Sequence, residues 1–381
     1  LLDSTIYMKA PPELIKRQTY NIQGEHQRTK ENQITFTSQP FTTTRPQEVR
    51  TGHGHKVLEA SRSRPIVLPK SGPIVPLKHK SISLAKNGYA VQIMRSLYGL
   101  KQSGRMWYQR FRDEMMIMGF TNEDIAPCLF IKKCENEFLI IAIYVDDINL
   151  FGHTNLLKTT IETLKRVFEM KDLGKTHYCL GLQFEHLPKG ILLHQSTYTT
   201  KILKQFNMDK AHPLTSPMEV RSLDRDKDAF RKRNENEPLL GPEKPYLSAI
   251  GALMFLANQT RPDIAFAVNL LARHSSQPTI RHWNGIKRIM RYLQGTIDMG
   301  LYFPTNDDKT LVGYADAGYL SDPDDAKSQT GYVFLQGSTA ISWKSTKQTL
   351  TCTSSNHAEI IALYEASREC IWLRRIIDHI N

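Results

Sequence analysis

The sequence contains no run of apolar residues long enough to span a membrane. About 18 or more consecutive apolar residues mark a candidate membrane helix, and none occurs in the 381 residues of the chain. We therefore predict a protein without a membrane partner. The N-terminal stretch LLDSTIYMKAPPEL lacks an initiator methionine and the layout of a signal peptide. It predicts a fragment or a cleaved product that carries no targeting signal.

Cysteine is also scarce. No two of the five cysteines form a Cys-x-x-Cys pair, and the set is Cys128, Cys134, Cys179, Cys352 and Cys370. This spacing excludes the common zinc-binding motifs. A sparse, odd-numbered set is typical of a reducing compartment rather than of a disulfide-stabilised secreted domain.

Acidic residues are few in the first third of the chain. Residues 10–112 hold 18 Lys and Arg against 5 Asp and Glu, whereas the remainder holds 32 against 33, so the net charge of +12 comes from one segment. A basic segment indicates a polyanionic partner, most simply nucleic acid, although a solvated unstructured arm has the same composition. Residues 17–90 show neither helical nor strand periodicity, and we predict that they form a flexible basic segment.

Two adjacent carboxylates stand between two strongly apolar runs. The order is FLIIAI, then Tyr144-Val145-Asp146-Asp147, then INLF. The β-branched and aromatic residues predict two strands joined by a tight turn. Like charges at the tip of a buried hairpin repel each other unless a cation neutralises them, and such carboxylates commonly hold Mg²⁺ for phosphoryl transfer. A plain polar hairpin tip is the alternative, which the missing turn glycine disfavours.

Helical periodicity recurs after this motif. We predict helices from Arg105 onward, over Lys158–Met170, within Tyr246–Gln294 and over Asn356–Ile380, and strands over Tyr178–Glu185 and Gly190–His194. Residues Arg221–Pro242 are charged and non-periodic, which predicts a linker or a mobile loop. Basic side chains accompany two of the helices, namely Lys101 and Arg105 at the first and Lys287, Arg288 and Arg291 near residue 290. A phosphate-contacting face and an ordinary solvated face both explain the second group.

The last segment predicts a small α/β domain. Three strands, over Leu311–Ala315, Gly331–Gln336 and Ala340–Lys344, precede the final helix. Asp316 ends the first strand and Glu359 lies in the first turn of the helix, so the two carboxylates are placed to converge on one cation. A turn Asp and a Glu favoured by the helix dipole are the alternative.

Eight blocks of the sequence, in order, resemble the Pol polyprotein of copia-type long-terminal-repeat retrotransposons. They include SLYGLKQSGRMWYQRF, IYVDDINLFG, TRPDIAFAVNLLARH, GYADAGYLSDP and SSNHAEIIALYEASRECIWLR. The resemblance covers about Val91–Asn381 and Leu2–Pro12. It implies a reverse transcriptase followed by ribonuclease H, with RNA template, DNA primer, RNA–DNA hybrid and dNTPs as partners. It also implies a cytoplasmic location, in a virus-like particle, or a nuclear one.

The resemblance gives the candidate site residues their roles. Asp146 is implied as a direct Mg²⁺ ligand and Asp147 as a supporting carboxylate, while Tyr144 and Val145 lie near the primer end. Asp316 and Glu359 match the first two carboxylates of ribonuclease H, and each site of the intact family holds two Mg²⁺ ions. Lys101, Arg105 and the basic residues near position 290 are the expected nucleic-acid contacts.

The chain also departs from the family pattern. The family takes a third polymerase carboxylate from a strand before the segment that matches LDSTIYMK, and Asp3 matches a later, non-catalytic position. The third ribonuclease H carboxylate follows the final helix, where Asp378 is wrongly placed to replace it. Residues 17–90 match nothing in the family. We therefore expect one carboxylate to be missing from each site.

The implied fold class is α+β, a right-hand reverse-transcriptase palm and thumb remnant followed by a partial ribonuclease-H-like α/β domain. The predicted segments are 1–16 (fingers and palm remnant), 17–90 (flexible basic segment), 91–220 (palm), 221–245 (linker), 246–305 (helical thumb or connection) and 306–381 (partial ribonuclease H). Three functions compete. They are a working reverse transcriptase with ribonuclease H, an inactive relic that at most binds nucleic acid, and an interaction protein recruited from a dead element.

Overall fold

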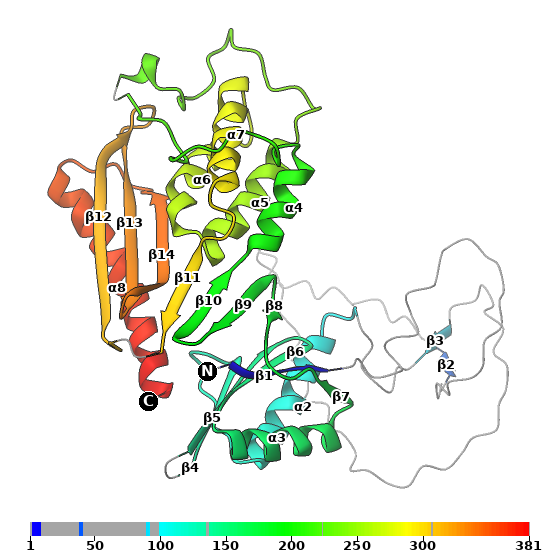
Figure 1. Cartoon of the computed structure of the whole chain (residues 1–381). Helices are drawn as coiled ribbons and strands as arrows, with labels where there is room; N and C mark the ends of the chain where they lie inside the picture. Colours follow the sequence, from blue (N-terminus) through cyan, green and yellow to red (C-terminus); the bar gives the residue numbers. More distant parts are fainter. Residues whose placement is uncertain are drawn as a thin grey trace, which may run out of the picture. The chain divides into compact units, whose positions relative to one another are not determined.

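The computed structural model describes nearly all of the chain after residue 98 (Figure 1). The described residues are 2–8, 38–40, 89–91, 99–134, 137–222, 224–305 and 308–380, the first three ranges by their backbone only. The chain divides into two compact units, one of Ala10–Glu114 and the other of Leu1–Lys9 with Met115–Asn381. Most of the predicted flexible segment, 17–90, lies outside the described residues.

The smaller unit contains a short strand pair and most of one helix. β2 (Ser38–Pro40) pairs antiparallel with β3 (Tyr89–Val91). Helix α2 (Ser103–Ile117) begins where Ser103 Oγ donates a hydrogen bond of 2.7 Å to the carbonyl oxygen of Leu100. The structure confirms the predicted helix, and the rings of Trp107 and Phe111, one turn apart, lie 5.9 Å from each other.

In the larger unit, the carboxylate motif belongs to a five-stranded antiparallel sheet, which we call the hairpin sheet. Its strand order is β4 (Leu129–Cys134), β5 (Glu137–Tyr144), β6 (Asp147–Gly152), β1 (Leu2–Met8) and β7 (Met170–Asp172). Helix α3 (Thr154–Val167) packs on this sheet through Leu157, Ile161 and Leu164. Leu139, Ile141, Ile148 and Leu150 are fully buried. The motif therefore extends from a well-packed core.

A second antiparallel sheet joins strands that are far apart in sequence. Its order is β11 (Gly300–Pro304), β10 (Gly190–His194), β9 (Leu182–Leu187) and β8 (Tyr178–Cys179). The prediction of one continuous strand over Tyr178–Glu185 is wrong. Leu180 and Gly181 have φ values of 52° and 80°, so a left-handed turn separates β8 from β9.

The chain between β10 and β11 forms a helical bundle. Its helices are α4 (Ser196–Gln205), α5 (Tyr246–Gln259), η2 (Pro262–Ile264), α6 (Ala265–Ala272) and α7 (Ile280–Gln294). Arg261 occupies the N-cap position of η2, and Pro262, whose fixed backbone angle suits the first turn of a helix, follows it. The fully buried side chains of Leu253, Leu256, Ile286 and Met290 lie in one continuous core, which explains why the apolar periodicity of this region is so regular.

Two stacked histidines lie inside this bundle. The rings of His274 and His282 are 3.9 Å apart and nearly parallel, and both side chains are buried. Burial is the main reason why the pKa of His274 falls to about 4, with the charge of His282 as a further cause, and burial also lowers the pKa of His282. Both rings are therefore neutral in the folded protein near pH 7.

We expect the free energy of unfolding to decrease as pH falls from about 6.5 toward 4, because the unfolded chain binds protons on these histidines in that range and the folded chain does not. Denaturant titrations at several pH values measure the slope. His274→Phe should flatten it, whereas the same change at the exposed His212 should leave it intact. An unchanged slope in His274→Phe would contradict the assignment.

The C-terminal part has the predicted order of three strands and a helix. β12 (Leu311–Asp322), β13 (Lys327–Gln336) and β14 (Thr339–Lys347) form an antiparallel sheet, and α8 (Ser355–Ile380) packs on β12 and β13. β12 continues well past the predicted end at Ala315 because β13 supplies register partners as far as Asp322. Among the described strands, β12 lies at the edge of this sheet.

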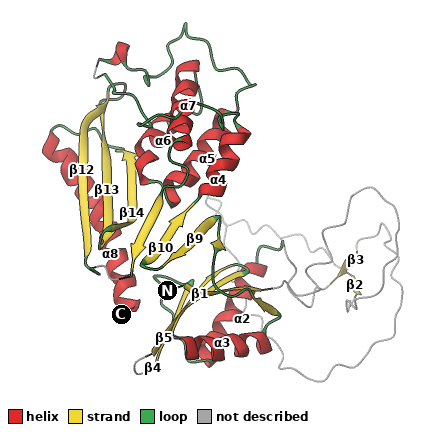
Figure 2. Cartoon of the chain, viewed as in Figure 1, coloured by secondary structure: helices red, strands yellow, loops and turns green. Residues whose placement is uncertain are grey.

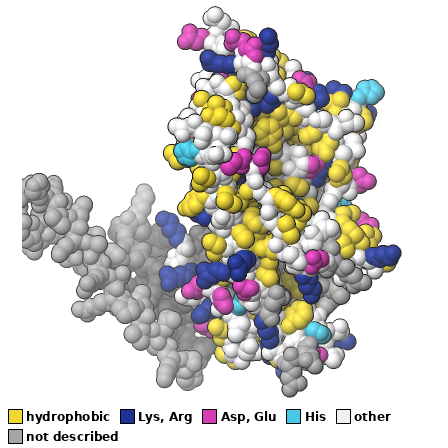
Figure 3. Space-filling model, turned by 90° about the vertical axis from the view of Figure 1, so that its left-hand side faces the viewer, with side chains coloured by type: hydrophobic (Ala, Val, Ile, Leu, Met, Phe, Trp, Pro, Cys, Tyr) yellow, Lys and Arg dark blue, Asp and Glu magenta, His cyan; other side chains and the backbone are white. Residues whose placement is uncertain are grey.

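Helix α8 carries apolar residues on two opposite sides. Ala358, Ala362, Ala366 and Leu373 are buried against the sheet. Ile360, Leu363, Tyr364 and Ile371 lie on the other side and are each more than 60 % exposed. Figure 3 shows hydrophobic side chains gathered on the face of the molecule that includes this region. Exposed apolar area of this kind favours association.

The predicted linker 221–245 makes many polar contacts. It contains the short helix η1 (Arg225–Lys227), and its Arg221 pairs with the buried Asp228 at 2.5 Å. Arg225 pairs with Asp324 at 3.0 Å, and Lys232 pairs with Asp325. The contacts of Arg225 and Lys232 tie the segment to the turn between β12 and β13, a role that its composition did not indicate.

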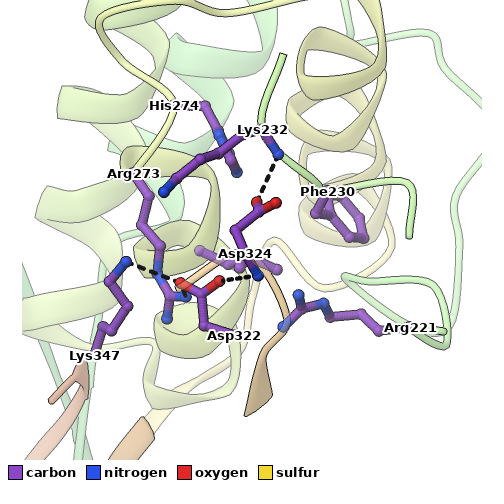
Figure 4. Close-up of a pocket in the computed structure, with 9 residues that line it drawn as sticks. Arg221, Phe230, Lys232, Arg273, His274, Asp322, Asp324 and Lys347 are labelled. Atoms are coloured by element: carbon purple, nitrogen blue, oxygen red, sulfur yellow. Dashed lines mark hydrogen bonds and ion pairs between the residues drawn. The ribbon is translucent and has the colours of Figure 1, made fainter. Parts of the chain in front are cut away.

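Charged side chains gather around a small cavity beside this segment (Figure 4). Arg221, Lys232, Arg273, His274, Asp322, Asp324 and Lys347, with Phe230 and Leu270, line a volume of about 60 Å³. Asp322 lies at the centre, 3.2 Å from Arg273 Nη1 and 2.8 Å from Lys347 Nζ. We call this group the junction cluster, because it joins the helical bundle to the C-terminal sheet.

Helices and antiparallel sheets thus alternate along the chain, in agreement with the predicted α+β class (Figure 2). Among the described residues, no helix has the length and apolar content needed to cross a membrane.

Candidate active site

The candidate polymerase site is the turn between β5 and β6. Tyr144 pairs with Asp147 across the two strands, so Val145 and Asp146 form a two-residue turn. Tyr144 and Val145 are 62 % and 57 % exposed, Asp146 is exposed, and Asp147 is half-buried. The packed strands hold both carboxylates at the surface, next to two large exposed side chains.

The turn contains a backbone conformation that its sequence does not favour. Val145 has φ = 53°, in the left-handed region. A β-branched residue rarely adopts this conformation, because its side chain clashes with the backbone there. Strain of this kind commonly marks functional sites. The missing turn glycine noted in the sequence therefore corresponds to a strained valine in the structure.

Val145→Asn should stabilise the protein by about 1 kcal/mol, since asparagine tolerates the left-handed region and relieves part of the strain. Thermal unfolding measures the change. The same substitution at Val220, which is fully exposed and has no positive φ, is the control and should have no comparable effect. A destabilised Val145→Asn variant would show that the valine side chain matters more than the strain.

The two carboxylates lie close enough for the charge of one to affect the ionisation of the other. Burial, and next the charge of Asp146, raise the pKa of Asp147 above its usual range. A cation between the two groups would favour the ionised form of both. Mg²⁺ is commonly bound by one or two carboxylates together with waters and substrate phosphates. The donor chemistry of Asp146 and Asp147 therefore fits Mg²⁺.

The neighbouring strand β1 adds no carboxylate opposite Asp147. Its register partner there is Tyr7, and Leu2 at the other end of β1 pairs with Phe151, so Asp3 lies far from the turn along the strand. Within the part of the chain that the structure describes, no three His, Cys, Asp or Glu side chains form a metal-binding group. Asp146 and Asp147 are thus a pair in this structure.

Three side chains that the sequence did not single out form a hydrogen-bonded group, which includes Asn149, two residues after Asp147 on β6. Asn149 Nδ2 donates to the Cys179 sulfur at 3.1 Å, and Thr176 Oγ1 donates to Asn149 Oδ1 at 3.4 Å. All three residues are buried. Asn149 was the available signal, because it is a polar residue inside the apolar run INLF.

The two candidate ribonuclease H carboxylates lie on β12 and α8, two elements that pack against each other. Asp316 is exposed on β12 and Glu359 is exposed in the first turns of α8. The residues next to them, Ala317 and Ala358, pack together in one buried cluster. The structure therefore brings the two segments into contact, while it groups neither carboxylate with further ligands among the described residues.

The predicted nucleic-acid contacts fall into two groups. Lys101 and Arg105 are exposed in the smaller unit, at the start of α2. Lys287, Arg288 and Arg291 are half-buried on α7. Arg288 pairs with Glu219 at 2.9 Å, and Arg291 Nε donates to the His212 carbonyl oxygen at 2.7 Å. Both guanidinium groups therefore have partners within the chain. This observation agrees with the alternative of an ordinary helix face.

Comparison with known proteins agrees with the carboxylate hairpin. A family model described as "Reverse transcriptase (RNA-dependent DNA polymerase)" matches residues 80–220. The chain is 36 % identical over 300 residues to the "Retrovirus-related Pol polyprotein from transposon TNT 1-94" of Nicotiana tabacum, which covers 78 % of this chain and 22 % of that protein. It is 33 % identical over 294 residues to the RE2 polyprotein of Arabidopsis thaliana, over 77 % of this chain and 20 % of the relative.

A shorter relative matches over nearly its whole length. The "Uncharacterized mitochondrial protein AtMg00810" of Arabidopsis thaliana is 33 % identical over 237 residues, which are 61 % of this chain and 94 % of that protein. No solved structure matches the chain.

Residues 80–220, which contain the hairpin, belong to the reverse transcriptase family. More closely, the chain belongs to the Pol polyproteins of copia-type retrotransposons. It spans about a fifth of the length of the first Pol polyproteins that it matches.

Proposed function

We propose that this chain carries the nucleotide-transfer site of a retrotransposon RNA-directed DNA polymerase. The observation that carries the proposal is the strained two-residue turn, which holds Asp146 and Asp147 side by side at the end of a buried hairpin. RNA template, DNA primer and dNTPs are the partners that the family implies.

The reaction joins a primer to a nucleotide. The 3′-hydroxyl of the primer attacks the α-phosphate of a dNTP, the new phosphodiester bond forms, and pyrophosphate leaves. Mg²⁺, when bound, activates the hydroxyl and neutralises charge on the leaving group. Asp146 and Asp147 would hold it. The exposed Tyr144 and Val145 supply a surface against which the primer end can lie.

The proposal includes a ribonuclease H function for residues 308–380. By the family resemblance, Asp316 and Glu359 would hold Mg²⁺ for hydrolysis of RNA in an RNA–DNA hybrid, and the residues next to them, Ala317 and Ala358, share one buried cluster. This assignment depends on the family resemblance of the residues and on the adjacency of the two segments.

Primer extension on an RNA template, with a labelled DNA primer, dNTPs and Mg²⁺, tests the polymerase function. The full chain should extend the primer, and chelation of the metal should stop extension. The release of labelled RNA fragments from a hybrid tests the ribonuclease H function separately. No extension above the chelated control at any Mg²⁺ or Mn²⁺ concentration would reject polymerase activity.

An inactive chain that retains nucleic-acid binding is the second candidate. The observation that favours it is the position of Tyr7, rather than an acidic residue, opposite Asp147. Binding to an RNA–DNA hybrid that weakens steeply with salt, without extension or cleavage, would support this function. No binding at low salt would reject it.

A further inference from the structure

The junction cluster encloses a cavity of about 60 Å³ between three separate parts of the chain. Arg273 lies at the end of α6, Lys347 is on β14, and Lys232 belongs to the predicted linker. One water molecule needs about 10–15 Å³ of such space. The cavity therefore has room for several waters or for one small polyatomic ligand.

The two carboxylates that line the cavity already have a donor at each oxygen (Figure 4). Asp322 Oδ2 accepts from Arg273 and Lys347. Asp322 Oδ1 accepts from the backbone N–H of Asp324 at 3.0 Å. Asp324 Oδ2 accepts from the backbone N–H of Lys232 at 2.7 Å, and its Oδ1 accepts from an arginine of η1 at 3.0 Å. Both acidic side chains are thus held by contacts within the chain.

Several nitrogen atoms around the cavity have no such contact. Arg273 donates through Nη1 and Nη2, while its buried Nε has no hydrogen-bond partner among the described residues. His274 Nε2 is also buried without a partner in this part of the chain, and His274 is only 8 % exposed. Lys232 Nζ donates to Asp325, which uses one of the three protons of an ammonium group. The cavity therefore presents unused nitrogen donors to a ligand.

The charges around the cavity indicate the sign of that ligand. Together with their ion-pair partners, the lining residues form a network of five cationic side chains and four carboxylates, so one positive charge remains. The members are Arg221, Arg225, Lys232, Arg273 and Lys347 with Asp228, Asp322, Asp324 and Asp325. A small anion neutralises this charge and accepts charge-assisted hydrogen bonds from arginine and lysine.

We propose that the cavity of the junction cluster binds one free tetrahedral oxyanion, of which inorganic phosphate is the simplest. Its oxygens accept from Arg273 Nε and Lys232 Nζ, and from His274 Nε2 in the form that carries a proton on that nitrogen. The ligand enters past Lys232, whose side chain is 52 % exposed, whereas those of Arg273 and Lys347 are 14 % and 24 % exposed. A phosphodiester continues on both sides of its phosphate, so a recess that opens on one side favours a free anion.

Isothermal titration of the full chain with inorganic phosphate, in EDTA and at constant ionic strength, tests the proposal. Arg273→Lys keeps the charge that pairs with Asp322 and removes Nε, and Lys232→Ala removes a half-exposed ammonium group. Each variant should bind phosphate roughly 10-fold more weakly, the value of one hydrogen bond to a charged group. Lys227→Ala, at a lysine of η1 that is 78 % exposed, is the control and should bind phosphate like the unaltered chain.

Two results of this titration would overturn the proposal. They are the absence of phosphate binding by the unaltered chain and equal affinity in the unaltered chain and all three variants. If Arg273→Lys does not fold, Lys232→Ala decides the question, because its side chain is half-exposed and its loss should leave the fold intact.

Thermal unfolding separates a bound anion from a general salt effect. A phosphate that binds the folded chain stabilises it by mass action, so the melting temperature should rise with phosphate in the unaltered chain and rise less in Lys232→Ala. Phosphate that is excluded from the protein surface also stabilises proteins. An equal rise in both chains would assign the effect to exclusion and contradict a site in the cavity.

A nucleic-acid strand is the other source of phosphate groups. An RNA–DNA hybrid without terminal phosphates, added in excess, should leave the affinity for inorganic phosphate unchanged. Loss of phosphate binding in the presence of the hybrid would assign the cavity to a strand backbone instead of a free anion. The anion site and the proposed polymerase function can fail independently, because none of these measurements uses primer extension.

Discussion

Replacing Asp146 by asparagine should reduce Mg²⁺-dependent primer extension by more than about 100-fold, because a direct ligand should matter at least as much as a residue that supports one. Asp146 is exposed at the turn and the new side chain has nearly the same volume, so the fold should not change. Initial rates at saturating primer and dNTP measure the effect. Mn²⁺ binding to the same variant should weaken in parallel.

The control for this prediction is Glu162→Gln, which removes a negative charge from the exposed face of α3. Equal rates in this control and the unaltered chain would show that net charge is not the cause. Equal rates in Asp146→Asn and the unaltered chain would contradict a role for the turn in catalysis. A contaminating polymerase would also give equal rates. Its activity would persist in the double variant that carries both Asp146→Asn and Asp147→Asn.

Asp322→Ala should lower the free energy of unfolding by about 3–5 kcal/mol, the cost of breaking a buried ion pair from one side. The Asp322 side chain is 8 % exposed and contacts Arg273 and Lys347, and Arg273 is 14 % exposed. Without Asp322, the guanidinium group of Arg273 remains buried beside Arg221 with less compensation. Denaturant unfolding measures the loss.

The pH dependence of this cluster has a defined direction. Although burial of Asp322 opposes ionisation, the hydrogen bond and the charge of Lys347 keep its pKa below the usual range. The carboxylate therefore stabilises the fold above the unfolded-state pKa, and this contribution is lost as pH falls through the lower folded-state pKa. Asp322→Ala should weaken the acid sensitivity of the protein.

Asp226→Ala is the matched control for this prediction, because Asp226 is an exposed acid in the nearby helix η1. It should change stability by less than about 0.5 kcal/mol, as is usual for surface substitutions. If alanine at position 322 prevents folding, Asp322→Asn keeps the shape and removes the charge. A loss below about 1 kcal/mol in both variants would show that the junction cluster does not stabilise the fold.

The hairpin motif shows which structural features the sequence predicted and which it did not. The strands on either side of Tyr144–Asp147 followed from β-branched and aromatic residues, and the missing glycine pointed to an unusual turn. The sequence did not predict the hydrogen bond between Asn149 and Cys179, because these two residues are 30 positions apart. Nothing local in either segment specifies the other as its partner.

The segment between residues 221 and 245 makes long-range contacts that its composition did not predict. Its charge and lack of periodicity indicated a linker, since such composition buries little apolar surface. In the structure its Arg225 and Lys232 pair with Asp324 and Asp325, which lie 99 and 93 positions away. Composition reports how much apolar surface a segment can bury, and it carries no information on where oppositely charged partners lie in space.

The sequence by itself determined the class of this protein, the helices and strands with strong periodicity, and the pair of carboxylates that the proposed function uses. Hydrophobic periodicity and turn chemistry depend on residues that are near neighbours in the sequence, so both can be recognised from the sequence alone. The tertiary structure alone decided the register that places Tyr7 opposite Asp147, the contacts of Asn149 with Cys179, and the burial of Asp322 with Arg273. These features depend on pairs of segments meeting in space, and the energy of a buried polar group is set by the partner that it meets there.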